Sequence, residues 1–127
     1  MNIHDYFESK RGLGVLATAD SDGKVNTAIY SRPHVINDET VAFIMADRRS
    51  HRNLQSNSRA SYLFREDTAG FDGMRLYLEK IREEKNSPLI EELRRKKRAE
   101  SARDADADRF LVFFRITERR PLVGNGE

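Results

Sequence analysis

The sequence contains no cysteine and no tryptophan. Without cysteine the chain cannot form a disulfide, a thiolate metal site or a cysteine nucleophile. Without tryptophan it has no strong platform on which nucleic-acid bases could stack. Nothing in the composition indicates an oxidising compartment, and we therefore expect a cytoplasmic protein.

An excess of charge of one sign is also missing, because 23 Lys and Arg face 21 Asp and Glu and the net charge is only +2. Binding to nucleic acid generally requires a face of one sign, so we expect no nucleic-acid partner. No apolar run approaches the roughly 20 residues of a membrane span. The polar start, with Asn2, His4 and Asp5, is unlike a signal peptide. We therefore expect no membrane partner.

The strand pattern predicts a mainly β fold. A chain of 127 residues fits one domain with a single core, and we expect residues 1–127 to form that domain. Asp22-Gly23 predicts a hairpin turn and Pro33 a bend, and the short links between the first three strands predict an antiparallel meander. Together the pattern predicts a closed barrel or a strongly curled sheet with peripheral α-helices. The six strand-like segments are 15–19, 25–36, 41–46, 60–65, 74–82 and 110–117.

Three short helices are expected around these strands. The first covers residues 2–10, and the second follows the 41–46 strand and ends near Asn57. Ser87 and Pro88 mark the start of the third, which we expect on the surface within about 86–103. Its apolar stripe is narrow and consists of Leu89, Ile90 and Leu93.

The stretch 41–54 is the most informative part of the chain. Val41 to Ala46 is a continuous apolar run, typical of a strand buried on both faces. It stops at Asp47, and the residues that follow are Arg48, Arg49, Ser50, His51 and Arg52. Ser50 could also cap a short helix. Guanidinium groups, a hydroxyl and free helix N–H groups together favour a phosphate site, and the alternative is a solvated basic turn.

The order of these segments resembles the pyridoxamine 5'-phosphate oxidase-like family of flavin-binding split barrels. The resemblance covers roughly residues 5–82 and resumes at 110–117. It implies a six-stranded antiparallel split barrel of the FMN-binding type, in which the helix within 86–103 is a variable insertion. The matching segments are Gly14-Val15-Leu16-Ala17-Thr18-Ala19, Asp22-Gly23 with Val25-Asn26-Thr27, the apolar strand 41–46, and Arg49-Ser50 with Arg52 ahead of Asn53-Leu54.

The same resemblance implies a homodimer that binds one FMN per subunit at the subunit interface. It identifies no catalytic side chain, because the flavin itself performs the redox chemistry. The implied cofactor contacts are Asn26, Thr27 and Ala28 along the isoalloxazine ring, Met45, Ala46 and Asp47 in the pocket wall, and Arg49, Ser50 and Arg52 at the phosphate.

The function implied is that of an FMN-dependent oxidoreductase acting on a small substrate. The alternatives are a flavin carrier or sensor without turnover, and a dimeric scaffold that has lost its cofactor; some relatives use a deazaflavin or haem. Vitamin B6 oxidation is not expected, because residues 119–124 do not match the substrate-binding end of the oxidase proper. The three histidines show no metal-ligand spacing, so no metal site is expected.

Overall fold

The computed structural model describes residues 2–96 and 108–124, and these form a mainly β structure. The helices are α1 (Ile3–Ser9), α2 (Arg49–Ser56) and α3 (Pro88–Lys96). The predicted continuation of the third helix beyond residue 96 lies outside the described residues. The strands are β1 (Gly12–Ala19), β2 (Val25–Ile29), β3 (His34–Asn37), β4 (Thr40–Met45), β5 (Arg59–Glu66), β6 (Gly73–Lys85) and β7 (Phe110–Pro121).

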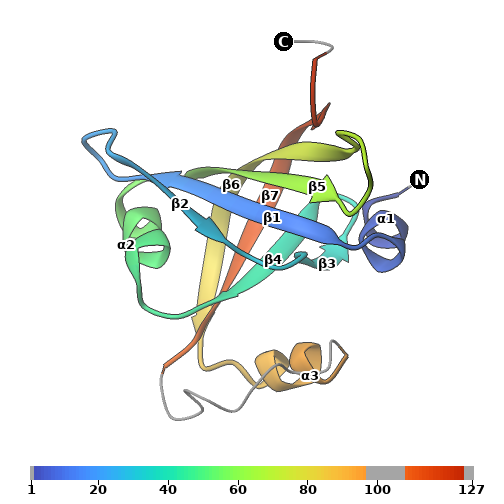
Figure 1. Ribbon diagram of the computed structural model, residues 1–127. Helices are drawn as coiled ribbons and strands as arrows, with labels where there is room; N and C mark the ends of the chain where they lie inside the picture. The colour runs from blue at the N-terminus through green and yellow to red at the C-terminus, as the bar shows by residue number, and fades with distance from the viewer. Residues whose placement is uncertain (1, 97–107, 125–127) are drawn as a thin grey trace.

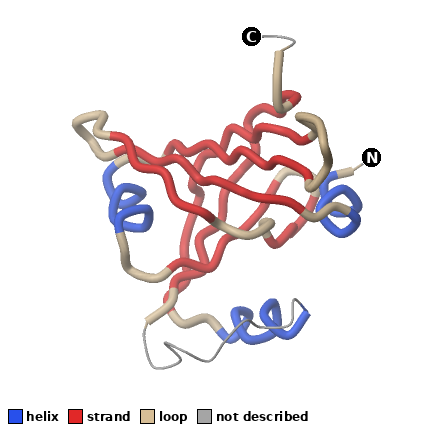
Figure 2. The backbone as a smooth tube through the Cα atoms, in the orientation of Figure 1, coloured by secondary structure: helices blue, strands red, loops and turns tan. Residues whose placement is uncertain are grey.

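Within the described ranges all strands join one antiparallel sheet in the order β2-β1-β5-β6-β7-β4-β3, which curls into a split barrel (Figure 1). The predicted fold class is therefore confirmed, with seven strands instead of six because the segment 25–36 is divided in two. Figure 2 shows the helices outside the curled sheet, with α1 and α2 at opposite ends. No helix in the described part of the chain has the length and apolar character of a membrane span.

The antiparallel pairings predicted for the first three strand segments are present, but the middle segment, 25–36, is divided into β2 and β3, so the three do not form a continuous meander. β2 pairs with β1, with Ile29 opposite Val15, whereas β3 pairs with β4, and β2 and β3 lie at opposite edges of the sheet. Between them lies the buried Pro33, which has no N–H to give to a β-ladder. β4 pairs on its other side with β7, with Phe43 opposite Val112.

The barrel core follows the two-residue period of the strands. In β1, Leu16 is fully buried while Leu13, on the opposite face, is 51% exposed. Gly14 lies beneath the ring of Tyr62, whose hydroxyl donates to the carbonyl of Tyr30 at 3.0 Å. A Cβ at Gly14 would lie 1.9 Å from that hydroxyl oxygen, so this close packing requires glycine.

β4 is buried on both faces, as the apolar run predicted. On one face Val41 and Phe43 join the barrel core, and on the other Ala42 packs with Leu111 of β7 and with Ile90 of α3. The helix begins where predicted, with the backbone N–H of Leu89 donating to Ser87 Oγ at 3.2 Å. α3 therefore covers the outer face of β4 and β7 with its narrow apolar stripe.

Candidate functional site

The turn between β4 and α2 brings the predicted anion site together. The backbone N–H of Arg48 donates to the carbonyl of Ala46 at 2.9 Å, which tightens the turn after the buried strand. The helix then begins at Arg49, and the backbone N–H of Arg52 donates to the carbonyl of Arg48 at 2.9 Å. Asp47 to Arg52 therefore surround the N-terminus of a helix, as an anion site requires.

The N-terminus of α2 has no side-chain cap. Its N-cap residue is Arg48, which has extended backbone angles and cannot supply a side-chain acceptor, and no acidic residue lies in the first turn. The prediction that Ser50 caps the helix is wrong, because the helix begins before it and Ser50 lies within its first turn. The first N–H groups of α2 are thus available as donors to an external anion.

The three arginines of the turn differ in their contacts. Arg48 and Arg49 are exposed, and in the described part of the chain neither takes part in an ion pair or a side-chain hydrogen bond. Arg52 instead interacts with Asp47: its Nε lies 3.7 Å from Oδ1, and Nη2 donates to the backbone carbonyl at 3.2 Å. Two guanidinium groups are therefore free to meet an anion, while the third is engaged with the turn itself.

β2 lies beside this turn, because α2 packs against β1 and β2. Asn26 and Ala28 are half-buried, while Thr27 is exposed on the opposite face of the strand. Only the first two side chains face the barrel side, so Thr27 could approach a ligand on that side through its main chain alone. Since β2 is an edge strand, one row of its backbone N–H and C=O groups has no partner in the sheet.

Tyr30 links the end of β2 to the first turn of α2. Burial raises the pKa of the Tyr30 phenol, while its contact with Ser50 and the nearby Arg48 guanidinium act in the opposite direction. Ser50 is only 4% exposed, so its hydroxyl is held in place between the two elements. β2 and the start of α2, two of the segments predicted to bind the cofactor, are therefore adjacent.

The third segment predicted to contact the cofactor is Met45 to Asp47, and its three side chains lie in different surroundings. The side chain of Met45 is fully buried in the barrel core, so Met45 could reach a ligand through its main chain alone. Ala46 is half-buried at the start of the turn, and Asp47 is exposed and paired. Because the strand alternates, a side chain that closes the core cannot also face a ligand.

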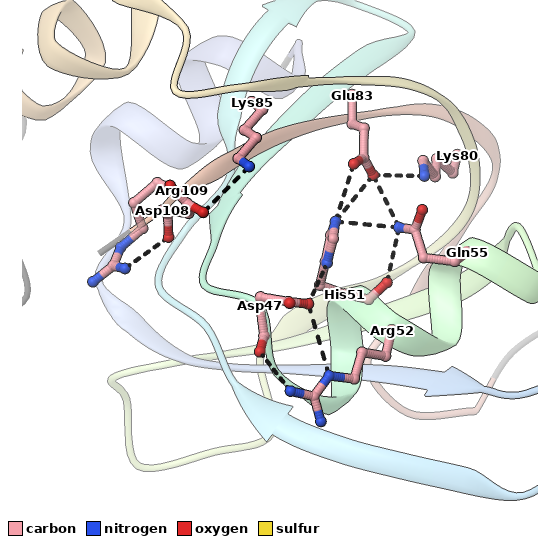
Figure 3. A network of polar contacts seen from close by, with 9 residues as sticks. All are labelled: Asp47, His51, Arg52, Gln55, Lys80, Glu83, Lys85, Asp108 and Arg109. Atoms are coloured by element: carbon pink, nitrogen blue, oxygen red, sulfur yellow. Dashed lines mark hydrogen bonds and ion pairs between the residues drawn. The ribbon is translucent and has the colours of Figure 1, made fainter. Parts of the chain in front are cut away.

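A polar network beneath α2 was not anticipated from the sequence (Figure 3). Nδ1 of His51, which is 5% exposed, lies 3.0 Å from Oδ1 of Asp47. Its Nε2 lies 3.1 Å from Oε2 of Glu83 on β6, and its ring stacks on Phe110 at a centroid distance of 3.9 Å. The i,i+4 spacing of Asp47 and His51 could have suggested the first contact.

Glu83 is the centre of this network. Burial alone would raise the pKa of the carboxyl, but hydrogen bonds from Lys80, Gln55 and His51 outweigh it and lower the pKa to about 2. Lys80 Nζ lies 2.7 Å and Gln55 Nε2 3.0 Å from Oε1. Glu83 is therefore an anion at neutral pH and fixes α2 to β6. In the described ranges, this network included, no group of three or more His, Asp or Glu side chains is arranged to hold a metal ion.

Solved structures with the same fold include flavin-binding proteins. An FMN-binding protein from Syntrophomonas wolfei subsp. wolfei is 19% identical, with a TM-score of 0.72, over 94% of this chain and 82% of that one. An F420 reductase is 15% identical, with a TM-score of 0.71, over 91% of this chain and 94% of that one. A proposed pyridoxamine 5'-phosphate oxidase from Lactobacillus delbrueckii is 16% identical, with a TM-score of 0.66, over 91% of this chain and 87% of that one.

No protein-family model matches the chain, and no curated protein matches its sequence. The structural similarity nevertheless extends over nearly the whole chain. The chain has the split-barrel fold of the pyridoxamine 5'-phosphate oxidase-like proteins, and the resemblance inferred from its sequence is confirmed at the level of the fold.

Proposed function

We propose that this protein binds FMN, with the phosphate at the N-terminus of α2, and acts as an oxidoreductase on a small substrate. The observation that carries the proposal is an uncapped helix start beside two unpaired arginines, Arg48 and Arg49. A phosphate would accept hydrogen bonds from the helix N–H groups and from both guanidinium groups. The FMN-binding protein and the F420 reductase with this fold support a flavin-type ligand.

The residues present fit such a ligand. Ser50 adds a hydroxyl in the first turn of α2, next to Tyr30, and the open edge of β2 offers backbone donors and acceptors to the polar rim of a flavin ring. A bound flavin would supply hydride and electron transfer. The chain would bind the phosphate, orient the ring and limit access to it. The oxidoreductase assignment and a cytoplasmic location are parts of the same proposal.

A homodimer is the second part of the proposal, and it rests on the outer face of the sheet. Val25 and Ile29 of β2 are 75% and 72% exposed, and Leu63 of β5 is 40% exposed. Ile29 and Leu63 lie on either side of Val15 in the same register row, so they share one face. Four exposed large apolar side chains, including Leu13, therefore extend across three adjacent strands. Contiguous exposed apolar surface of this kind marks an interaction site.

The partner on this face would be a second copy of the chain. A two-fold dimer joins one patch to itself, and an apolar centre requires no opposite charge on the partner. The face includes the outer side of β2, whose inner side lies by α2. A dimer formed here would bring the partner close to the proposed flavin site. The dimer would thus limit solvent access to a bound ring.

Titration of the purified protein with FMN and with riboflavin tests the function. Riboflavin has the same ring and no phosphate, so the proposal expects FMN to bind at least about tenfold more tightly, the equivalent of about 1.4 kcal/mol. A flavin absorption band in the purified protein and its anaerobic reduction by a nicotinamide nucleotide would support an oxidoreductase. Binding without reduction by any donor would favour a carrier or sensor. Failure to bind either flavin would overturn the proposal.

A further inference from the structure

The ring of His51 is held between two carboxylates. Nδ1 lies 3.0 Å from Asp47 Oδ1, and Nε2 lies 3.1 Å from Glu83 Oε2 (Figure 3). Ionised carboxylates only accept hydrogen bonds, so both contacts are hydrogen bonds only when both ring nitrogens carry a proton. The N–H groups of Gln55 have their own acceptors, Glu83 Oε1 and the His51 carbonyl, each at 3.0 Å. In this arrangement a doubly protonated ring donates to both carboxylates.

The charge of such a ring bears on the proposed phosphate site through Asp47. Asp47 is the one acidic residue of the turn, and an unbalanced carboxylate there would repel a phosphate. Two side chains that can carry a positive charge flank it instead, His51 on the inner side and Arg52 at 3.7 Å. Figure 3 shows Asp47 between these two side chains. The turn therefore presents the positive charge of Arg48 and Arg49 and the dipole of α2.

We infer that His51 is a positioning residue, which holds the Asp47 carboxylate against the protein, balances its charge and so sets the affinity of the turn for phosphate. The inference rests on the proposed function and assigns one of its residues a role beyond direct contact. His51 would not touch the flavin. It would act through Asp47 on one side, and Glu83 on the other would keep its ring in place.

The surroundings of His51 are consistent with this role. From its own helix Gln55 and Arg52 join the network, and from β6 come Glu83 and Lys80. β7 contributes the ring of Phe110, over which Lys85 also lies at 6.0 Å. Lys85 is paired with Asp108 at 3.3 Å and does not compete for Glu83. The ring is thus fixed on three sides by elements of the barrel.

The test compares FMN and riboflavin affinities of His51→Leu at neutral pH, by quenching of flavin fluorescence. Leucine keeps apolar contact with Phe110 and removes both hydrogen bonds. The dissociation constant for FMN should rise about tenfold, while that for riboflavin should change less than about twofold. Adding Asp47→Asn to this variant removes the unbalanced carboxylate. The dissociation constant for FMN should then return to within about threefold of the wild-type value. If His51→Leu does not fold, His51→Gln, which is uncharged and retains a donor, carries the same expectation.

Asn53→Ala is the matched control. Asn53 is also buried on α2 and ties it to β1, with Nδ2 donating to Thr18 Oγ1 at 3.0 Å, but the contact carries no charge. This variant should melt at a lower temperature and keep the wild-type preference for FMN over riboflavin. Equal weakening of both flavins in His51→Leu, or no recovery with Asp47→Asn, would overturn the inference. If the wild-type protein shows no preference for FMN, the proposed function fails as well.

Discussion

Glu83 on β6 and His51 on α2 are 32 residues apart in sequence, yet a carboxylate oxygen of one lies 3.1 Å from a ring nitrogen of the other. Lys80 and Gln55 reach the same carboxylate. The helix that carries the proposed phosphate turn is therefore fixed to the longest strand of the described sheet. This contact has measurable consequences for stability.

Acid should weaken the fold through Glu83. Its pKa is about 2 in the folded protein and about 4.5 when unpaired, so the unfolded state binds the proton more readily. The contribution of this carboxylate is therefore complete above about pH 4.5 and is lost as pH falls toward 2. After allowance for solvent screening, we expect wild type to lose on the order of 1 kcal/mol more than Glu83→Gln between pH 7 and pH 3. Urea unfolding at the two pH values measures this, and equal losses would contradict it.

Arg49 and Ser50 should matter to FMN and not to riboflavin. Replacing both by alanine removes one guanidinium and one hydroxyl from the proposed phosphate site and should cost about 2–4 kcal/mol of FMN binding. Isothermal titration calorimetry provides the measurement. Arg59→Ala is the matched control, because Arg59 is also an exposed arginine but lies on β5. Wild-type FMN affinity in the double variant would remove both residues from the site.

Charge on the outer sheet face should separate the proposed dimer. Ile29→Glu combined with Leu63→Glu places two carboxylates in the apolar row without touching the core. The protein should remain folded and become monomeric, as measured by light scattering after size-exclusion chromatography and by circular dichroism. Ile81→Glu, at a position that is 51% exposed on β6, serves as the control and should leave the dimer intact. A double variant that stays dimeric would locate the interface elsewhere.

Val112→Asp should unfold the chain outright. The near-continuous apolar run at 110–117 is typical of either a central strand or an oligomer interface. In the structure β7 lies between β6 and β4, and Val112 is fully buried in the barrel core. Burying an unpaired carboxylate there should cost more than about 3 kcal/mol. Loss of the β-sheet signal in circular dichroism is the expected result, and a folded monomer would contradict it.

Ile90→Ala tests whether α3 is more than a surface addition. Ile90 is 4% exposed and packs with Ala42, Leu111 and Phe113 on the outside of the barrel. Truncation should lower the free energy of unfolding by about 2–3 kcal/mol. FMN affinity should be unchanged, because α2 and β2 lie on other parts of the sheet (Figure 1). A loss below about 0.5 kcal/mol would mean that α3 is only loosely docked.

Local signals predicted the elements well. Asp22-Gly23 forms the turn before β2, with Gly23 at φ 83°. In the sequence the apolar alternation slips near Lys80 and Ile81, and β6 has a register shift there. Strand order was not accessible in the same way. The short links predicted a continuous meander, but the segment 25–36 is divided at Pro33, and β4 pairs on its other side with a strand some 70 residues further along the chain.

The candidate site was predicted where its chemistry is local. The basic turn of Arg48 to Arg52 follows directly from consecutive residues, and the structure places it at a helix start. Its side-chain details depended on register: the helix begins one residue before Ser50, and Met45 falls on the core side of β4. Glu83 could not be found, because only the pairing of distant strands brings it to His51.

The position of β7 has a consequence for how the molecule assembles. β7 is the last of the described strands in chain order, yet it separates β2-β1-β5-β6 from β4-β3 and hydrogen-bonds to both groups. During synthesis, β6 and β4 therefore have no strand between them to pair with until β7 leaves the ribosome. Contacts of such long sequence separation form slowly and leave strand edges open. A nascent chain arrested before residue 110 should consequently be the species that chaperones bind and that aggregates.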